Sequence, residues 1–217
     1  MISVPRLYAV VDAAFFSTSE DLTVFALELI AGGCTLLQYR NKSGDARVML
    51  EQARELRRQS RAGAPSTPAQ GRSAAHIPQL IMNDRADLCL VAEFDGVHVG
   101  QDDLSPESVR GIIGPRWVGV STHNPEQVKE ADLTSADYLA IGPVFSTSSK
   151  GQPDPVVGLE GVRRARQATR KPLVAIGGIT RGNAASVIEA GADSVAVISD
   201  LLRDPRKSAE EFFRVLR

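Results

Sequence analysis

The sequence predicts a (β/α)8 barrel of the TIM-barrel class, folded as a single domain over residues 1–217. Two observations support this prediction: β-rich apolar runs recur eight times, and segments with helical spacing separate them. Strands that alternate with helices imply parallel pairing. The units are compact, and none carries a G-x-G-x-x-G turn after its strand, so a closed barrel is favoured over the alternative, a doubly wound open sheet.

The predicted strands are short runs rich in Val, Leu, Ile and Ala, with polar residues at their carboxyl ends. They cover residues 7–12, 34–40, 79–84, 95–100, 117–122, 137–144, 172–179 and 193–199. The predicted helices cover 19–33, 45–59, 124–133, 159–170, 183–192 and 204–217. The first begins in a Ser-Glu-Asp cap and ends at a Gly-Gly pair, a favourable start and stop. The second places its apolar side chains on one side and its charges on the other. We expect shorter helices after the third and fourth strands.

One segment interrupts this regular spacing. Residues 60–78 are rich in Pro, Gly, Ser and Ala and join the second helix to the third strand. Such a composition is typical of a flexible insertion. In a barrel this connection lies at the end opposite the active site, so we expect no role in chemistry.

Composition excludes several classes of protein. The net charge is −1, which gives no reason to expect a nucleic acid or an anionic membrane as partner. No stretch resembles a secretion signal or a membrane span. The two cysteines, Cys34 and Cys89, lie far apart in apolar surroundings and are expected to be buried free thiols in a reducing compartment. We therefore expect a cytoplasmic protein whose partners are small molecules, with a homo-oligomer left open.

Polar and charged residues gather where the predicted strands end. In a (β/α)8 barrel these ends build the active site, so the residues should converge. The candidates, in chain order, are Gln38, Arg40, Lys42, Asn83, Asp84, Asp103, Ser121, Thr147, Ser149, Lys150, Gly178 and Ser199. Cations and hydroxyls bind phosphate oxygens, and carboxylates bind a hard cation. The set therefore indicates a polyphosphate held together with Mg²⁺.

Two of these candidates, Asp84 and Asp103, are the predicted metal ligands. Two carboxylates completed by phosphate oxygens and water suit octahedral Mg²⁺, which seldom takes an all-protein cage. The alternative for Asp84 is a helix cap, because the sequence NDRADL opens a helical stretch.

The sequence IGGITRGN, residues 176–183, predicts a second and smaller anion site. Adjacent glycines let backbone N–H groups approach a phosphate closely, and the loops after the last two strands of such barrels commonly bind one. The alternative is a tight turn that needs glycine for its conformation.

In this order, the motifs resemble the thiamine phosphate synthase family. The resemblance runs from YAVVD through QYRNK, IMND, DGVHVGQDD, GVSTH, DYLAIGPVFSTSSK and VAIGGI to VAVIS, over residues 8–199. It implies a Mg²⁺-dependent (β/α)8 enzyme that joins hydroxymethylpyrimidine pyrophosphate to a thiazole phosphate and releases pyrophosphate. It also implies roles for the candidate residues. The pyrimidine pyrophosphate would be bound by Gln38, Arg40, Lys42 and Asn83, the metal by Asp84 and Asp103, and the substrates further by Ser121, Thr147, Ser149, Lys150, Gly178, Ile198 and Ser199.

Two positions depart from the family pattern. Ser149 stands where threonine is usual, which keeps the hydroxyl. Asp200 stands where a small apolar residue is common, and a carboxylate near a phosphate pocket is unfavourable unless it points away.

The implied reaction needs electrostatic catalysis more than proton transfer. The amino group of the pyrimidine would stabilise a cation at the exocyclic carbon, so we expect a dissociative displacement with charge developing on the departing pyrophosphate. Arg40, Lys42, Lys150 and Mg²⁺ would stabilise that charge, while Ser121 is a further candidate catalytic residue. Two alternatives remain: a thiazole tautomerase using His123 as its acid or base, and a non-catalytic regulator that binds thiamine precursors. His98 and His76 are not expected to act on substrate.

Overall fold

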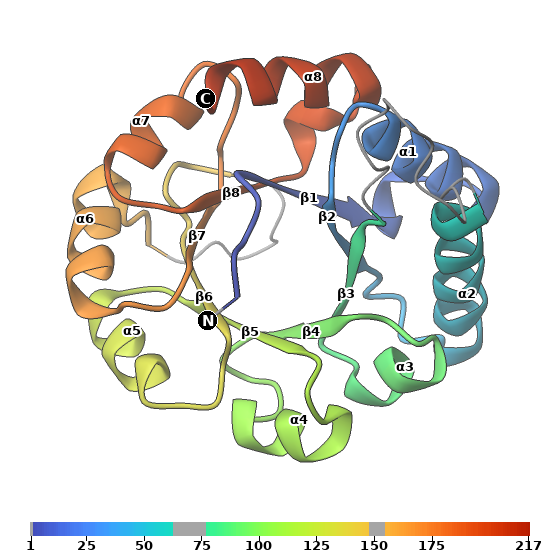
Figure 1. Ribbon diagram of the computed structural model, residues 1–217, viewed down its shortest axis with the longest axis horizontal. Helices are drawn as coiled ribbons and strands as arrows, with labels where there is room; N and C mark the ends of the chain where they lie inside the picture. The colour runs from blue at the N-terminus through green and yellow to red at the C-terminus, as the bar shows by residue number, and fades with distance from the viewer. Residues whose placement is uncertain (1, 63–76, 148–154) are drawn as a thin grey trace, which may run out of the picture.

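The computed structural model describes residues 2–62, 77–147 and 155–217. Eight parallel strands close into a barrel in the order β1 to β8, and β8 pairs with β1. The helices surround this barrel as an outer ring (Figure 1). The strands are β1 Leu7–Asp12, β2 Leu36–Arg40, β3 Gln79–Asn83, β4 Gly96–Val99, β5 Trp117–Thr122, β6 Tyr138–Ile141, β7 Leu173–Ile176 and β8 Ser194–Val197. The predicted closed barrel is confirmed.

Each strand is followed by a helix. The α-helices are α1 Ser19–Ala31, α2 Ala46–Ala62, α3 Ala86–Val91, α4 Pro106–Ile113, α5 Pro125–Asp132, α6 Gly158–Ala168, α7 Ala184–Glu189 and α8 Pro205–Val215. Two short 3-10 helices, η1 Ala13–Phe15 and η2 Ser199–Leu201, follow β1 and β8. The predicted insertion at 60–78 begins inside α2, and its residues 63–76 lie outside the described part of the chain.

Successive side chains of each strand point alternately into two apolar layers. Their inward side chains fill the barrel interior, and their outward side chains pack under the helices. The interior cluster is small and includes two buried tyrosines, Tyr8 and Tyr138, beside Leu36, Ile81 and Val174. Polar hydroxyls in this interior need hydrogen-bond partners.

Both cysteines lie in the outer layer, and their predicted burial as free thiols is confirmed. Cys34 and Cys89 are free and buried. Burial raises the pKa of each thiol to about 12, so neither is a reactive thiolate at neutral pH. Within the described ranges, no helix has the length and apolarity to span a bilayer.

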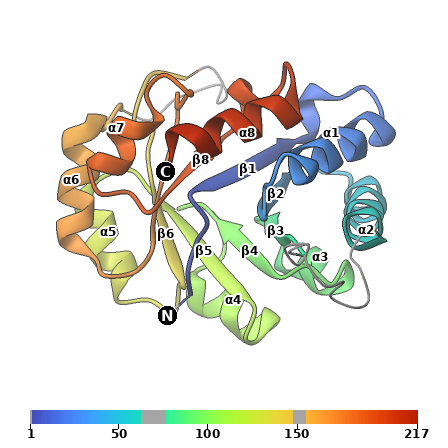
Figure 2. The same cartoon turned by 45° about the horizontal axis from the view of Figure 1, so that its top comes forward.

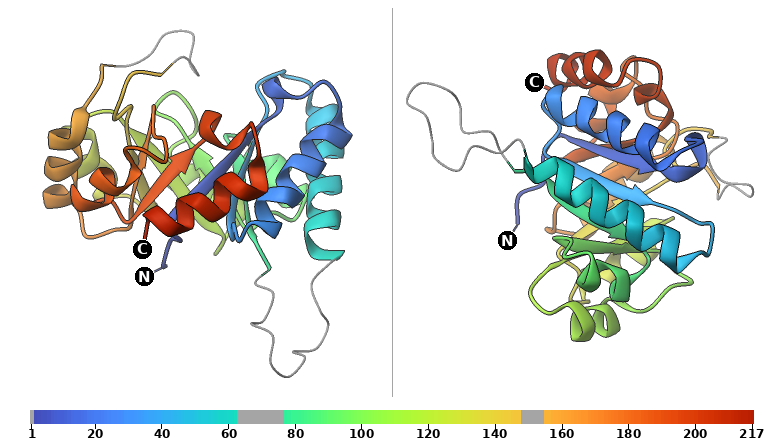
Figure 3. Two further views of the ribbon diagram at one scale, coloured as in Figure 1. Left: turned by 90° about the horizontal axis from the view of Figure 1, so that it is seen from above. Right: turned by 90° about the vertical axis from the view of Figure 1, so that its right-hand side faces the viewer.

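The two ends of the barrel differ. Figure 2 shows β1 lying between β2 and β8. Both pairings are parallel, so the strands share one direction. Both termini lie at the amino-terminal end of the strands in both views of Figure 3. The carboxyl ends of the strands therefore face the opposite end, which is the end expected to carry the site.

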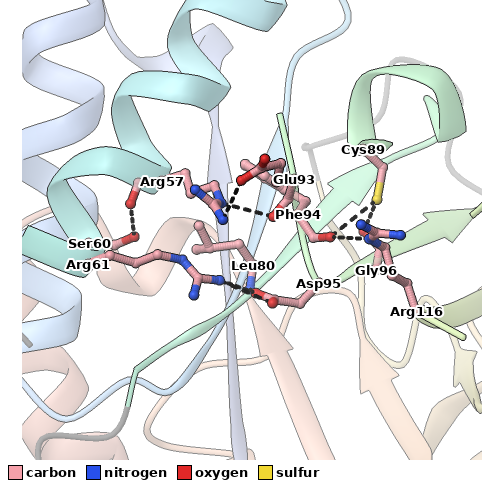
Figure 4. A network of polar contacts seen from close by, with 10 residues as sticks. All are labelled: Arg57, Ser60, Arg61, Leu80, Cys89, Glu93, Phe94, Asp95, Gly96 and Arg116. Carbon is pink, nitrogen blue, oxygen red and sulfur yellow. Dashed lines mark hydrogen bonds and ion pairs between the residues drawn. The ribbon is translucent and has the colours of Figure 1, made fainter. Parts of the chain in front are cut away.

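A repeated ion pair fastens the amino-terminal end. An aspartate precedes each of β4, β6 and β8, accepts a backbone N–H from the neighbouring strand at 2.8 Å and pairs with an arginine of a surrounding helix. The three sets are Asp95 with Leu80 N and Arg61, Asp137 with Val118 N and Arg110, and Asp193 with Leu173 N and Arg166. Figure 4 shows the first set, beside which Arg57 pairs with Glu93 at 2.6 Å.

We predict that Asp137→Ala lowers the free energy of unfolding by about 2 kcal/mol, because it leaves the Val118 N–H without its acceptor and removes the partner of Arg110. Turnover should not change, since the site is at the other end of the barrel. Urea unfolding measures this effect. Glu160→Ala is the control, because Glu160 is an exposed ion-pair partner whose loss should cost less than about 0.5 kcal/mol. Equal effects of the two substitutions would contradict the prediction.

Candidate active site

A cavity of about 360 Å³ opens at the carboxyl ends of the strands. All eight strands, or the loops that follow them, contribute to its wall. The predicted site residues that line it are Gln38, Arg40, Asn83, Ser121, Thr147, Gly178, Ile198 and Ser199. Ser149 and Lys150 lie outside the described residues. The fold thus brings together side chains that are up to 161 positions apart in sequence.

Arg40 is held by a carboxylate that we did not assign to the site from the sequence. Asp12 ends β1, is 3% exposed and forms an ion pair with Arg40. The two residues are direct neighbours in the register of β1 and β2. The Asp12 carboxylate also accepts the N–H of Ala14 at 3.1 Å, which fixes its orientation. Asp12 therefore anchors the guanidinium at the cavity wall.

The two predicted metal ligands meet beside the cavity. Asp84 forms an ion pair with Lys42, which lies just beyond the end of β2. Burial raises the pKa of Asp84, and the nearby Asp103 carboxyl raises it further, against the lowering effect of Lys42. Two carboxylates this close repel each other when both are ionised. A cation between them would remove that repulsion.

Asp84 is not a helix cap. The residue that precedes α3 is Arg85, and no side chain caps the start of that helix. Asp84 instead has φ of 61°, in the left-handed region that non-glycine residues seldom adopt. Its N–H donates to the carbonyl of His98 at 2.8 Å, which holds this conformation. The backbone therefore turns the carboxylate toward Lys42 and Asp103.

Asn83, the last residue of β3, carries an unpaired donor. Asn83 is 8% exposed, and its side-chain amide nitrogen is buried and makes no hydrogen bond to any described residue. A buried amide without a partner is costly. Because Asn83 lines the cavity, a bound ligand can accept this hydrogen bond.

The loop after β7 exposes backbone donors. Gly178 has φ of 63°, and a Cβ added there would lie 2.5 Å from the carbonyl oxygen of Ser146. Asn183 closes the loop by donating to Gly178 O at 3.1 Å and accepting the N–H of Thr180 at 2.8 Å. The N–H groups of Gly178 and Ile179 make no hydrogen bond within the described chain. The glycine thus serves the turn and the exposed donors alike, and the two interpretations of IGGITRGN are compatible.

Asp200 does not leave an uncompensated charge near this loop. Its carboxylate accepts from the backbone N–H of Arg181 at 2.8 Å and from the Arg181 guanidinium at 3.0 Å and 3.1 Å. Arg181 also forms an ion pair with Glu211 of α8. The arginine neutralises Asp200 and ties the loop after β7 to the end of β8.

Hydrogen bonds cross the barrel interior below the cavity. Gln38 donates its amide to the Tyr8 hydroxyl at 3.0 Å, and Tyr8 contacts the Tyr138 hydroxyl at 3.0 Å. His98 contacts Tyr138 through Nδ1 at 3.0 Å and Ser121 through Nε2 at 2.8 Å. Burial lowers the pKa of His98 to about 4, so the ring is neutral at pH 7.

From the sequence, His98 is not expected to act on substrate; the structure places it in the cavity wall, in contact with the candidate residue Ser121. The ring of Tyr138 reaches this position because Gly119 has no side chain. A Cβ there would lie 2.1 Å from the tyrosine ring.

His123 also lines the cavity. It directly follows β5, and its Nδ1 lies 2.8 Å from the carbonyl oxygen of Gly142. Its backbone N–H donates to Gln127 Oε1 at 2.7 Å. These contacts hold His123 at the end of β5.

The donor set suits a hard cation that shares its coordination with a ligand. No group of three or more His, Cys, Asp or Glu side chains forms a metal cage within residues 2–62, 77–147 and 155–217. Asp84 and Asp103 supply two oxygen ligands, and Mg²⁺ commonly takes its remaining ligands from water and phosphate. The residues present therefore fit Mg²⁺ bound together with a phosphorylated substrate.

Comparisons with known proteins show the family of the chain. The model of the family described as thiamine monophosphate synthase matches residues 7–201. The thiamine-phosphate synthase of Koribacter versatilis is 58% identical over 99% of this chain and 97% of its own. That of Chloroflexus aurantiacus is 43% identical over 89% of this chain and 83% of its own. The solved thiamine phosphate pyrophosphorylase from Pyrococcus furiosus superposes with a TM-score of 0.81 at 30% identity, covering 97% of this chain and 95% of its own. The chain therefore belongs to the thiamine monophosphate synthase family.

Proposed function

We propose that this transferase condenses 4-amino-2-methyl-5-hydroxymethylpyrimidine pyrophosphate with a thiazole phosphate, giving thiamine phosphate and pyrophosphate. The observation that carries the proposal is that Arg40 lines the cavity, while Lys42, Asp84 and Asp103 meet directly after Asn83, another residue of the cavity wall. Cations beside paired carboxylates suit a diphosphate that arrives with a divalent cation. The family membership is in accord with this assignment.

The two substrates would lie at opposite sides of the cavity. The pyrimidine would occupy the interior above Gln38 and Ser121, with its diphosphate toward Arg40 and Asn83. The thiazole phosphate would accept hydrogen bonds from the backbone N–H groups of Gly178 and Ile179, which make no hydrogen bond within the described chain and belong to residues of the cavity wall. This arrangement would place the attacking nitrogen against the carbon that loses pyrophosphate.

The chemical step would be dissociative. The C–O bond to pyrophosphate breaks, and the thiazole nitrogen then forms the new bond to the same carbon. That nitrogen carries no proton, so no general base is required. Arg40 and Lys42 would stabilise the negative charge that develops on the leaving group, and Lys150 is proposed to join them. Asn83 would donate its unpaired amide N–H to a diphosphate oxygen.

Asp84 and Asp103 would hold Mg²⁺, which when bound supplies positive charge to the diphosphate. In this structure the Lys42 ammonium group forms an ion pair with the Asp84 carboxylate. On binding of the metal and substrate, its ammonium group could exchange Asp84 for a phosphate oxygen. We further propose a cytoplasmic location, in accord with two buried free thiols.

The experiment is a reconstitution with purified protein and both phosphorylated heterocycles. Thiamine phosphate and pyrophosphate should form in equal amounts, only when both substrates and Mg²⁺ are present. Chelation with EDTA should stop the reaction, and Mg²⁺ in excess should restore it. Binding of both heterocycles without turnover would instead indicate a regulator, and isomerisation of the thiazole without pyrophosphate release would indicate a tautomerase using His123.

A further inference from the structure

Five side chains form an unbroken hydrogen-bonded chain through the barrel interior. The order is Gln38, Tyr8, Tyr138, His98 and Ser121, with successive contacts of 3.0, 3.0, 3.0 and 2.8 Å. The five residues come from five different strands. Both end residues line the cavity, and the Gln38 Oε1 atom makes no hydrogen bond within the described chain. Both ends of this hydrogen-bonded chain therefore face the cavity, where a ligand would bind.

Each link in this chain holds one proton. The hydroxyls of Tyr8 and Tyr138 are fully buried, and burial raises the pKa of both, so they stay protonated. His98 is buried, and both of its ring nitrogens contact hydroxyl groups and no carboxylate within the described chain, so its ring takes the neutral form with one N–H and one acceptor nitrogen. A neutral group in the middle of the chain can donate to one neighbour only while it accepts from the other. The direction of one hydrogen bond therefore fixes the direction of all four.

The observed orientation of Gln38 sets that direction. Its amide nitrogen donates to Tyr8, so Tyr8 donates to Tyr138. Tyr138 then donates to Nδ1 of His98, which places the histidine proton on Nε2. Nε2–H donates to Ser121 Oγ, and the serine proton is left to point into the cavity. Gln38 thus presents an acceptor to the ligand while Ser121 presents a donor.

We propose that this chain couples its two ends, so that the site selects a heteroaromatic edge carrying one hydrogen-bond donor and one acceptor. If every hydrogen bond in the chain were reversed, Gln38 would present a donor to the ligand and Ser121 would present an acceptor. No neutral, fully bonded arrangement lets both ends donate to the ligand, because the reversed chain commits the Ser121 proton to His98. Tyr8, Tyr138 and His98 are positioning residues for specificity. The inference rests on the proposed function, since an aminopyrimidine offers an amino donor beside a ring-nitrogen acceptor.

The direct readout is the tautomer of His98, observed by ¹⁵N NMR of histidine-labelled protein bound to 4-amino-2-methyl-5-hydroxymethylpyrimidine phosphate. We expect Nε2 protonated and Nδ1 unprotonated in this complex. A Nδ1–H tautomer or a doubly protonated ring would overturn the assigned direction. This readout needs no turnover, so it stays interpretable if the proposed reaction fails. Reconstitution of the wild-type protein tests that reaction separately.

The coupling is tested by binding. In the 4-methoxy counterpart of the same pyrimidine phosphate, the amino donor becomes an acceptor. We expect the wild-type protein to bind the amino compound about 100-fold more tightly, because a mismatch at Gln38 propagates to Ser121. Tyr138→Phe and Tyr8→Phe cut the chain at different links. Each should reduce the preference to about tenfold or less, because Gln38 and Ser121 then orient independently.

The two variants serve as controls for each other. A packing defect would differ in size between the two variants and would weaken binding of the amino and the methoxy compound equally. Uncoupling would instead lower the ratio of the two affinities, and would do so in both variants. Circular dichroism and the urea midpoint verify that each variant is folded. If both folded variants keep the wild-type ratio, the coupling is refuted.

Discussion

Replacement of Asp103 by asparagine should reduce turnover by about 10²- to 10³-fold at a fixed Mg²⁺ concentration. The substitution removes one of two carboxylates that face each other beside the cavity, where charge rather than shape is needed. An asparagine oxygen can still accept the N–H of Gly100, which Asp103 now accepts at 2.8 Å, so the loop should keep its conformation. Steady-state release of pyrophosphate, measured over a range of Mg²⁺ concentrations, tests this expectation. The loss should shrink as Mg²⁺ is raised, because the site is weakened and not removed.

The matched control is Asp102→Asn. Asp102 directly precedes Asp103 and is exposed as Asp103 is, and the substitution makes the same change in net charge. Its turnover should stay within about twofold of the wild-type value. An Asp103→Asn enzyme with near wild-type turnover, or a loss that does not respond to Mg²⁺, would contradict the assignment of Asp103 as a metal ligand.

Replacement of Arg40 by alanine should have an effect of similar or greater size, a loss of about 10³-fold in turnover. Its guanidinium lies in the cavity wall, where the leaving group is proposed to develop charge. Arg40→Lys should recover only part of this loss, because an ammonium lacks the planar fork that binds a phosphate and Asp12 together.

Arg40→Ala should also lower the free energy of unfolding by about 2 kcal/mol, because it leaves the buried Asp12 carboxylate without its cation. The double variant Asp12→Asn/Arg40→Ala separates the two effects. Stability should return toward the wild-type value, while turnover stays low. If turnover recovered together with stability, Arg40 would act through the fold and not on the leaving group.

The sequence was sufficient to predict features that depend on local pattern. The polar end of the second predicted strand placed Gln38 and Arg40 among the site candidates, and both line the cavity. The closed barrel followed from eight repeated units and then implied that the ends of distant strands converge. Only the fold could bring Ser199 of the last unit to the same cavity as Gln38 of the second.

Features that depend on register or backbone conformation could not be predicted in this way. Asp12 is one carboxylate at the end of an apolar strand, and its role appears only when β1 is aligned beside Arg40. Similarly, His98 lies between two valines and gives no local signal of its contact with Ser121. Asp84 has a left-handed backbone and does not cap α3, and no sequence pattern specifies that angle.

Asp200 illustrates the same limit. From the sequence alone, the negative charge of Asp200 beside a phosphate pocket is unfavourable. In the structure, Arg181 forms an ion pair with this carboxylate. Arg181 lies nineteen residues earlier in the chain, and its other partner, Glu211, lies on α8. Sequence alone offered no means of joining these three residues.

The most direct measurement is a calorimetric titration of the wild-type protein with pyrophosphate, carried out once in the presence of Mg²⁺ and once in the presence of EDTA. Paired carboxylates and anchored cations predict binding that requires Mg²⁺ and that weakens at least about tenfold in both Asp103→Asn and Arg40→Ala. Pyrophosphate that binds equally well in EDTA, or equally well to both variants, would show that these side chains do not act on one shared ligand.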